Sequence, residues 1–280
     1  MRIAMRTDFC GNDMDRVVEY AHTLGITDIW DLPTSADCYD EAGIVEVGRL
    51  EKYKRRFSDE GLDLGVLTAS IDEKAVISTE SAMREARPIR QMIEAMGKVG
   101  IDLLFFFLNI PVAPEKDAAE QQWKHLIEFY QEIVSCAEDS QVRIATHGHQ
   151  FSNFIIYNCA GFSRLLEAVP SDYNGVTFCP GCHKLAGDDI YEAIHQLEEK
   201  IFFAHARDVM REHDTFKDVI FDSGEVDMLR VLRQLQQIGY EGLVCPEHLP
   251  KVKYEPHDEI TSAWSLGYLA SALSTLSIEP

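Results

Sequence analysis

Short runs of apolar, β-branched and aromatic residues recur along the whole chain and alternate with longer segments of helical periodicity. The runs predict eight strands, at Arg2–Met5, Thr27–Trp30, Leu62–Leu67, Asp102–Leu108, Val142–Thr146, Val176–Cys179, Ile201–His205 and Leu243–Cys245. Between them, apolar residues at i, i+3, i+4 and i+7 predict helices, as over residues 14–24 and 89–99. Glycines at positions such as Gly25, Gly61 and Gly100 come directly before the next strand, as expected of helix ends.

The order of these elements predicts an α/β fold of the (β/α)8 TIM-barrel type. Eight strands that alternate with eight helices over about 250 residues are what this barrel requires. A doubly wound open sheet is the alternative, but it would normally carry a glycine-rich first βα loop, which this sequence lacks. No proline- or serine-rich linker, charge run or change of composition divides the chain, so we expect one domain over residues 1–280.

Composition and charge exclude several classes of protein. Of 280 residues, 46% are hydrophobic and 26% charged, which is ordinary for a globular protein and unlike a disordered chain. The 47 acidic against 26 basic residues give a net charge of -21, which argues against nucleic acid or anionic lipid as the partner. The apolar run Leu103–Leu108 is too short to span a bilayer. A small acidic substrate remains compatible, since it needs only two or three local cations.

Cysteine usage favours a reducing, cytoplasmic setting. Seven cysteines are an odd number, and the segment Met1–Cys10 has no apolar core of a signal peptide. In such a compartment a cysteine is a core residue, a ligand or a catalyst more often than half of a disulfide.

Side chains that can bind a metal end four consecutive predicted strands. The site of a barrel of this type lies at the carboxyl ends of its strands. There the sequence offers two imidazoles, one thiol and one carboxylate, namely His147, Cys179, His205 and Glu247. Strand alternation places His149 on the face of His147, and Arg207 on the face of His205. Such a set suits one divalent ion, Zn²⁺, Fe²⁺, Mn²⁺ or Co²⁺, and the thiolate argues against Mg²⁺ and Ca²⁺.

Each of these residues also has an ordinary structural interpretation. A lone histidine at a strand end is usually hydrogen-bonded, a lone cysteine packs in the core, and a lone glutamate is solvated. Only their joint placement on adjacent strands favours a metal site. Cys179 and Cys182 also form a C-x-x-C pair, but a redox dithiol is typical of a thioredoxin-like fold and a zinc knuckle needs a second pair. We therefore expect Cys182 in a loop or beside the ligands.

Motifs in the second half of the chain resemble those of the mannonate dehydratase family. They keep the order and nearly the spacing of the family, at residues 177–181 (TFCPG), 205–208 (HARD), 222–228 (DSGEVDM) and 246–248 (PEH). The resemblance implies a xylose-isomerase-like TIM barrel that eliminates water from D-mannonate to give 2-dehydro-3-deoxy-D-gluconate. It also implies Mn²⁺ as the expected ion, held by His147, Cys179, His205 and Glu247, with Fe²⁺, Co²⁺ and Zn²⁺ as alternatives.

The same resemblance suggests roles for residues around the metal. His248 matches a histidine of acid–base catalysis, and Arg207 matches an arginine that would hold the substrate carboxylate. We include Asp208 with these two as catalytic candidates. Four further residues are candidates for substrate binding, namely Arg6, His149, His183 and Lys184. For Arg6 and Lys184, a solvated charge at the rim is an equally good interpretation.

The chain departs from the family pattern at several positions. Glu247 stands where aspartate is usual, Asp208 where asparagine is usual, and Phe221 where the family has histidine. Cys245 precedes Pro246 without the arginine of the family motif, and the chain is shorter than typical members. These differences bear on the substrate more than on the metal.

Three other functions fit parts of the sequence. A sugar isomerase or 3-epimerase on the same barrel is the main alternative, although those enzymes usually bind metal through carboxylates and one histidine, unlike Cys179. An endonuclease of abasic DNA is disfavoured by the net charge, and a non-catalytic sugar- or metal-binding barrel is the fourth possibility. In every enzyme interpretation the partner is a small sugar acid or sugar, with neither nucleic acid nor membrane, and a homo-oligomer is left open.

Overall fold

Eight parallel strands close into a barrel in the computed structural model, which describes residues 1–31, 38–39, 44–213, 215–253, 255 and 257–277. The barrel strands are β1 (Arg2–Arg6), β2 (Asp28–Asp31), β3 (Asp63–Asp72), β4 (Leu103–Asn109), β5 (Arg143–His147), β6 (Asn174–Phe178), β7 (Ile201–Ala206) and β10 (Leu243–Pro246). They follow one another around the barrel as β1-β10-β7-β6-β5-β4-β3-β2, with every pair parallel. All eight strands predicted from the sequence are confirmed, and the open sheet is excluded.

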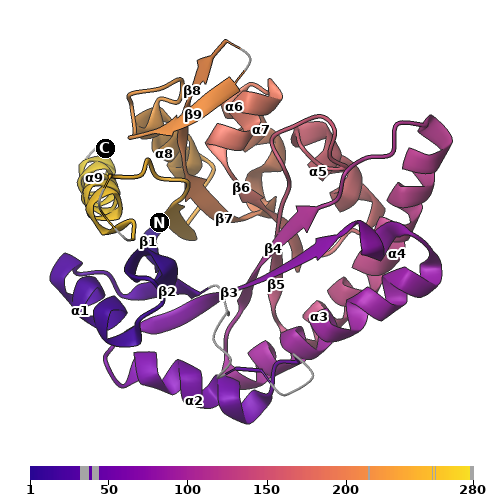
Figure 1. The fold of residues 1–280 in the computed structure, drawn as a ribbon, viewed down its shortest axis with the longest axis horizontal. Helices are drawn as coiled ribbons and strands as arrows, with labels where there is room; N and C mark the ends of the chain where they lie inside the picture. Colours follow the sequence, from indigo (N-terminus) through magenta and orange to yellow (C-terminus); the bar gives the residue numbers. More distant parts are fainter. Residues whose placement is uncertain (32–37, 40–43, 214, 254, 256, 278–280) are drawn as a thin grey trace.

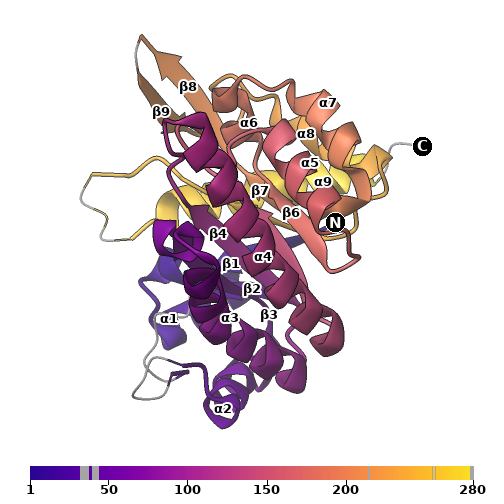
Figure 2. The same cartoon turned by 90° about the vertical axis from the view of Figure 1, so that its right-hand side faces the viewer.

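Helices follow each barrel strand and form the outer layer of the molecule (Figures 1 and 2). They are α1 (Met14–Leu24), α2 (Val47–Ser58), α3 (Thr79–Val99), α4 (Lys116–Ser140), α5 (Cys159–Ala168), α7 (Ile190–Leu197), α8 (Met228–Gln237) and α9 (Glu259–Leu276). A further short helix, α6 (Pro180–Ala186), begins directly after β6, and 3₁₀ turns span Thr7–Cys10, Glu73–Val76 and Glu198–Lys200. Among the described helices, none is both long and apolar enough to cross a membrane.

Helix α1 illustrates how the sequence sets the ends of these elements. The Asp13 side chain accepts hydrogen bonds from the backbone N–H groups of Asp15 and Arg16, which would otherwise lack partners in the first turn. At the other end Gly25 has φ of 67°, a left-handed conformation that glycine adopts without strain. Its turn lets the N–H of Ile26 donate to the carbonyl of Ala21, and the chain then enters β2.

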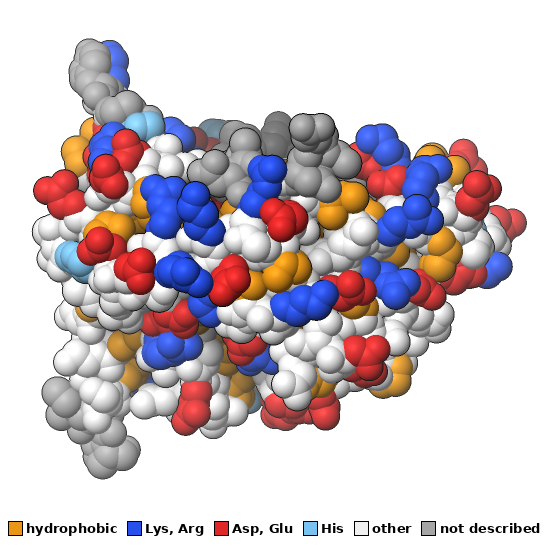
Figure 3. Space-filling model, turned by 90° about the horizontal axis from the view of Figure 1, so that it is seen from below, with side chains coloured by type: hydrophobic (Ala, Val, Ile, Leu, Met, Phe, Trp, Pro, Cys, Tyr) orange, Lys and Arg blue, Asp and Glu red, His pale blue; other side chains and the backbone are white. Residues whose placement is uncertain are grey.

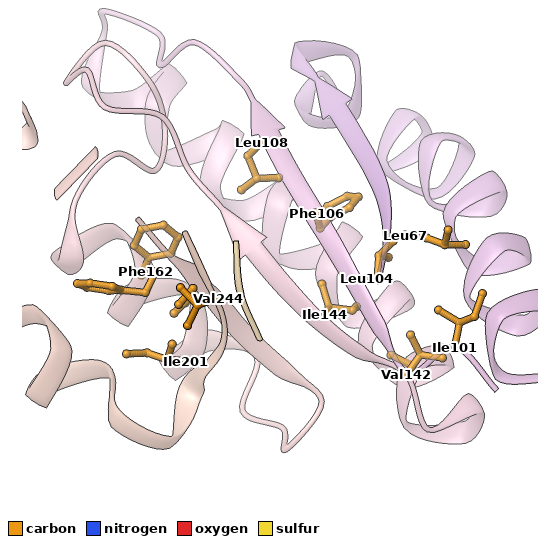
Figure 4. Packing of buried hydrophobic residues seen from close by; sticks show 14 of the residues in the cluster. Leu67, Ile101, Leu104, Phe106, Leu108, Val142, Ile144, Phe162, Ile201 and Val244 are labelled. Atoms are coloured by element: carbon orange, nitrogen blue, oxygen red, sulfur yellow. The ribbon is translucent and has the colours of Figure 1, made fainter. Parts of the chain in front are cut away.

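Strand alternation divides the buried residues into two layers. On β4, Leu104, Phe106 and Leu108 pack between the barrel and the helices, together with residues such as Ile144 of β5 (Figure 4). The alternate positions of the same strand point into the barrel. There Phe105 contacts the indole of Trp30 from β2, with ring centroids 4.8 Å apart. Aromatic rings thus fill the barrel up to the level at which its polar residues begin.

A two-stranded antiparallel hairpin interrupts the regular alternation after β7. It consists of β8 (Asp208–Glu212) and β9 (Thr215–Val219), and it projects beyond the barrel next to α6 (Figures 1 and 2). The sequence did not predict this hairpin, because its residues lack the strict apolar alternation of a half-buried strand. Elsewhere, on the face near α2 seen in Figure 3, acidic and basic side chains are interspersed.

Candidate metal centre

A cavity of about 430 Å³ opens at the carboxyl ends of the barrel strands, where the inward-facing positions end in polar and aromatic side chains. Its walls are formed by Arg6, Trp30, Thr68, Ser70, Phe105, Phe107, His147, His149, Gln150, Arg207, Glu247 and His248. Pairs of residues two apart come from β3 (Thr68 and Ser70), from β4 (Phe105 and Phe107) and from the end of β5 (His147 and His149). The strand alternation that fills the lower barrel with apolar groups therefore lines its mouth with polar ones.

Possible metal ligands lie together at the base of this cavity. The donor atoms of Cys179, His205 and Glu247 all lie within 4.8 Å of one another, and so do those of His147, Cys179 and Cys182. Cys179 belongs to both groups, so the four residues chosen from the sequence form one connected cluster. All five side chains are buried. The structure thus brings the four sequence-predicted ligands together and adds Cys182, which we had not placed among them.

Several donor atoms in this cluster have no hydrogen-bond partner among the described residues. Neither ring nitrogen of His205 has a hydrogen-bond partner among the described residues, although its side chain is fully buried. Among the same described residues, Nδ1 of His147 and Oε2 of Glu247 also lack hydrogen-bond partners. Buried polar groups are rarely left unsatisfied, and each costs about 1–3 kcal/mol when it is. A divalent cation would satisfy these atoms, so the residues present fit the metal implied by the sequence.

Aromatic rings hold His205 in place in the absence of hydrogen bonds. Its imidazole stacks on the indole of Trp30, with centroids 5.2 Å apart, and also contacts Phe105 at 5.3 Å. The Trp30 indole is itself fixed, because its Nε1–H donates to Thr68 Oγ1 at 2.7 Å. Burial among these rings lowers the pKa of His205, so its imidazole is neutral and free to bind a metal.

The polar surroundings of Cys179 favour its thiolate. Burial alone would raise the pKa of this thiol, but Cys182, His147 and His205 around the sulfur outweigh burial and hold the pKa well below its ordinary value. Cys182 carries the proton of the pair, since its contact with Cys179 and its burial raise its own pKa. A thiolate is the form of cysteine that binds metals.

Glu247 and His248 form a hydrogen-bonded pair at the cavity wall. His248 Nε2 lies 2.8 Å from Glu247 Oε1. Burial would raise the pKa of Glu247, but this hydrogen bond and the nearby His205 lower it to about 2. The same bond raises the pKa of His248 against the effect of its own burial. The backbone at His248 is left-handed, with φ of 52°, a strained conformation of the kind that clusters at functional sites.

Two arginines flank the cluster with positive charge. Arg207 is 2% exposed; its Nε donates to Asp218 Oδ1 at 2.8 Å and its Nη1 donates to the Cys182 sulfur at 3.4 Å. Arg6 lies over the Trp30 ring and approaches Glu247 Oε1 at 3.9 Å. Both guanidinium groups line the cavity, where an anionic substrate would meet them.

Asp218 of the hairpin connects the two predicted catalytic residues. Its Oδ1 accepts from Arg207, and its Oδ2 lies 3.8 Å from His248 Nδ1. We did not predict its role from the sequence. The register of β9 against β8 turns this side chain toward the site, and no local sequence pattern records that register. The sequence-based prediction of the site also missed Gln150 and the cavity residues from β2, β3 and β4. Counting alternate, inward-facing positions along each strand could have found Trp30 and Phe107.

His149 lines the cavity as predicted. Its ring stacks face to face on Phe154, with centroids 3.7 Å apart and planes 3° apart. Burial lowers its pKa most, and the nearby His147 lowers it further. His149 therefore presents a neutral imidazole to the cavity, suited to accept a proton or a hydroxyl hydrogen bond.

Asp208 does not line the cavity, contrary to our sequence-based expectation. Its carboxylate accepts three backbone hydrogen bonds, from Val209 (2.7 Å) and Val226 (3.0 Å) to Oδ1 and from Gly224 (2.8 Å) to Oδ2. Burial raises its pKa, and these three amides act against that effect. The residue therefore ties the segment after the hairpin to the end of β7, a structural role that its position next to Arg207 concealed.

His183 and Lys184 also lie away from the cavity walls. His183 is buried, stacks on Phe178 and places Nδ1 2.7 Å from Asp188 Oδ2. Lys184 lies 4.0 Å from Glu225 on the outer side of α6. The helix that begins at Pro180 turns both side chains out of the site, which the sequence alone did not reveal because we expected a loop there.

A family model for D-mannonate dehydratase (UxuA) matches residues 112–274, more than half of the chain. The chain belongs to this family. Mannonate dehydratase 1 of Halalkalibacterium halodurans is 29% identical over 148 residues, a match that covers 49% of this chain and 40% of the relative. The chain thus matches less than half of the length of such curated relatives. All the sequence-predicted metal ligands lie within the matched range, whereas the cavity residues from β1 to β4 lie outside it.

Solved structures show the same fold along the whole chain. The mannonate dehydratase of Streptococcus suis serotype 2 superposes with a TM-score of 0.81 at 17% identity, covering 99% of this chain and 93% of that one. An L-ribulose 3-epimerase superposes with a TM-score of 0.76 at 16% identity and covers 99% of this chain and 95% of its own. At these identities the likeness shows the fold alone, and it confirms the closed (β/α)8 barrel expected from the sequence.

Proposed function

We propose that this chain is a metal-dependent sugar-acid dehydratase and that D-mannonate is the first substrate to test. The observation that carries the proposal is the buried set of donors without protein partners, at the mouth of a barrel that belongs to the D-mannonate dehydratase family. The reaction removes the proton next to the substrate carboxylate and the hydroxyl of the neighbouring carbon as water. The resulting enol becomes a 2-keto-3-deoxy acid.

The proposed metal ligands are His147, Cys179, His205 and Glu247. Two imidazoles, a thiolate and a carboxylate suit a borderline divalent cation. Bound there, such an ion would polarise the substrate and acidify the proton next to its carboxylate.

The two arginines orient the substrate. Arg207 and Arg6 present guanidinium groups to the cavity, and Asp218 keeps Arg207 in place through its Nε. We propose that Arg207 holds the carboxylate of the sugar acid in a charge-assisted pair. Arg6, at the end of β1, adds a second positive charge to the cavity, so a neutral sugar would gain less from the site than a sugar acid.

Two histidines provide the proton transfers. His248 has a raised pKa, so it is the better proton donor to the departing hydroxyl. His149 has a lowered pKa, so its neutral ring is the better acceptor of the proton next to the carboxylate. The aromatic rings of Phe105 and Phe107 line the cavity between the strands and reduce its contact with water.

Turnover of sugar acids and keto-sugars by the metal-loaded protein tests this function. D-mannonate should give a 2-keto-3-deoxy acid, detected by NMR through its new methylene group. The H248N variant keeps a residue that tolerates the left-handed backbone and should lose at least about 100-fold in kcat. The H195N variant changes an exposed histidine of α7 and should retain full activity. Interconversion of keto-sugars without dehydration would instead assign the chain to the isomerases and epimerases.

A further inference from the structure

We propose that Cys182 is a second sulfur ligand of the metal centre and that it directs the site toward Zn²⁺, Fe²⁺ or Co²⁺ rather than Mn²⁺. The inference rests on the metal centre of the proposed function and is independent of which sugar acid is the substrate. It concerns a residue of this chain that neither the strand positions nor the family resemblance selected.

The geometry already suits a shared ion. Cys182 follows Cys179 by three residues, and the first turn of α6 brings its sulfur back beside the end of β6. The Cys182 sulfur lies 3.9 Å from His147 Nε2, and both lie within 4.8 Å of the Cys179 sulfur. Around an ion with metal–sulfur bonds of about 2.3 Å and metal–nitrogen bonds of about 2.1 Å, angles of about 90–109° separate such donors by about 3.1–3.6 Å. Small side-chain adjustments therefore complete the bonds.

The surroundings of Cys182 are those of a ligand. It is 6% exposed, and around its sulfur lie the His147 imidazole, the Gln150 side-chain oxygen at 4.0 Å and the Arg207 guanidinium at 3.4 Å. The Arg207 contact compensates the negative charge that a second thiolate brings to the centre. A cysteine that serves only packing is surrounded by apolar groups and hardly ionises.

Cys159 shows the contrast within the same chain. It is also buried, but it does not belong to either group of converging donors. In the cluster itself, neither ring nitrogen of His205 has a hydrogen-bond partner in the described part of the chain. A metal ion shared by both groups would give these donor atoms a common electron-pair acceptor.

A second thiolate changes which ion the site prefers. Soft sulfur donors favour Zn²⁺, Fe²⁺ and Co²⁺, while Mn²⁺ prefers oxygen and binds N/O/S sites weakest in the first-row series. With Cys182 the ligands comprise two sulfurs, two imidazoles and one carboxylate. We therefore expect this chain to retain a thiophilic metal when Mn²⁺ competes for the site.

Titration of the metal-free protein with Co²⁺ tests the proposal without any substrate. Thiolate ligands give a charge-transfer band in the near ultraviolet, so the C182S variant should show about half of the wild-type band, and so should C179S. Competition should show a loss of at least about tenfold in Zn²⁺ affinity for C182S, with the Mn²⁺ affinity changed less than about twofold. The C159S variant is the matched control, and circular dichroism, with C182A as a second variant, confirms the fold.

The outcomes separate this inference from the proposed function. An undiminished band and an unchanged Zn²⁺ affinity in C182S would overturn the role of Cys182, even if the protein dehydrates D-mannonate. A halved band in a protein that dehydrates no sugar acid would support Cys182 as a ligand and refute the proposed activity. Wild-type protein that shows no thiolate band at all would overturn both the centre and its second sulfur.

Discussion

Replacing Asp208 by alanine distinguishes the structural role seen in the fold from the catalytic role suggested by the sequence. Its carboxylate accepts the N–H groups of Val209, Gly224 and Val226 at 2.7, 2.8 and 3.0 Å. The bonds from Gly224 and Val226 join the start of β8 to the segment before α8, and the bond from Val209 lies within β8. The D208A variant removes the acceptor and leaves three backbone donors in a buried environment.

The size of the effect follows from these bonds. Hydrogen bonds to a charged acceptor contribute about 1.5–3 kcal/mol each, so the three together set an upper limit of about 4.5–9 kcal/mol. Water can enter the space left by the carboxylate and the segment can relax, so we expect D208A to lose about 4 kcal/mol of the free energy of unfolding. The D208N variant keeps one oxygen for Val209 and Val226 but turns its amide group toward the N–H of Gly224, and should lose about 2 kcal/mol.

Urea denaturation followed by circular dichroism measures these differences in the metal-free protein. Asp189 provides the control, since it caps α7 with hydrogen bonds from Tyr191 (2.9 Å) and Glu192 (3.1 Å) at an exposed position. There the loss on replacement by alanine should be about 1 kcal/mol. If D208A unfolds within about 0.5 kcal/mol of the wild type and yet loses turnover, Asp208 belongs to the chemistry and our assignment is wrong.

Three further predictions concern the site. Restoring Zn²⁺ to chelated protein at a hundredfold excess over its Kd should add about 2.7 kcal/mol of stability, and a denaturation midpoint indifferent to the ion contradicts the metal centre. The R207K variant cannot contact both Asp218 and Cys182, so the KM of the sugar acid should rise about tenfold; a change confined to kcat would refute its binding role. In G181A the added Cβ would lie 2.8 Å from Arg207 Cγ, so its KM should rise similarly, whereas Gly267, with open space, should tolerate alanine.

The barrel was predictable because each of its elements carries its own local signal. The end of α1 is one example. A glycine, Gly25, predicts the left-handed turn that ends the helix, and the apolar run that follows it predicts β2. The alternation of side chains along each strand also predicted which residues face the inside of the barrel. It placed His147 of β5 and His205 of β7, on the two sides of β6, at the same level of the barrel, and in the structure their ring centroids lie 5.0 Å apart.

The residues that were misassigned depend on contacts that no local pattern records. Asp208 and His183 are polar groups next to motif residues, and sequence reasoning sees only that adjacency. Asp208 accepts hydrogen bonds from the amides of Gly224 and Val226, and His183 is hydrogen-bonded to Asp188. Only the folded chain shows that the two side chains are engaged in these contacts. A buried polar residue whose hydrogen bonds are already satisfied has little left for a substrate.

The substrate-facing wall was the least predictable part of the site. Thr68 and Ser70 are small polar residues in a strand, which is common in any sheet, and Asp218 reaches the site only because the hairpin folds over it. The wall from β1 to β4 also lies outside the range matched by the family model. The proposed metal ligands thus lie in the part of the chain that matches the family, and under our proposal the choice among sugar acids would depend on a wall outside that part.

The contact between Arg6 and Glu247 joins the first and last strands of the barrel where β1 pairs with β10. A polypeptide synthesised only as far as β7 holds His147, Cys179 and His205 but not the carboxylate that completes the proposed set. Under our proposal, ion capture by the full set waits until β10 has been synthesised and has docked on β1. The metal content of the protein would then indicate whether the barrel has closed. A chain truncated before Leu243 should bind less metal and should also be unstable.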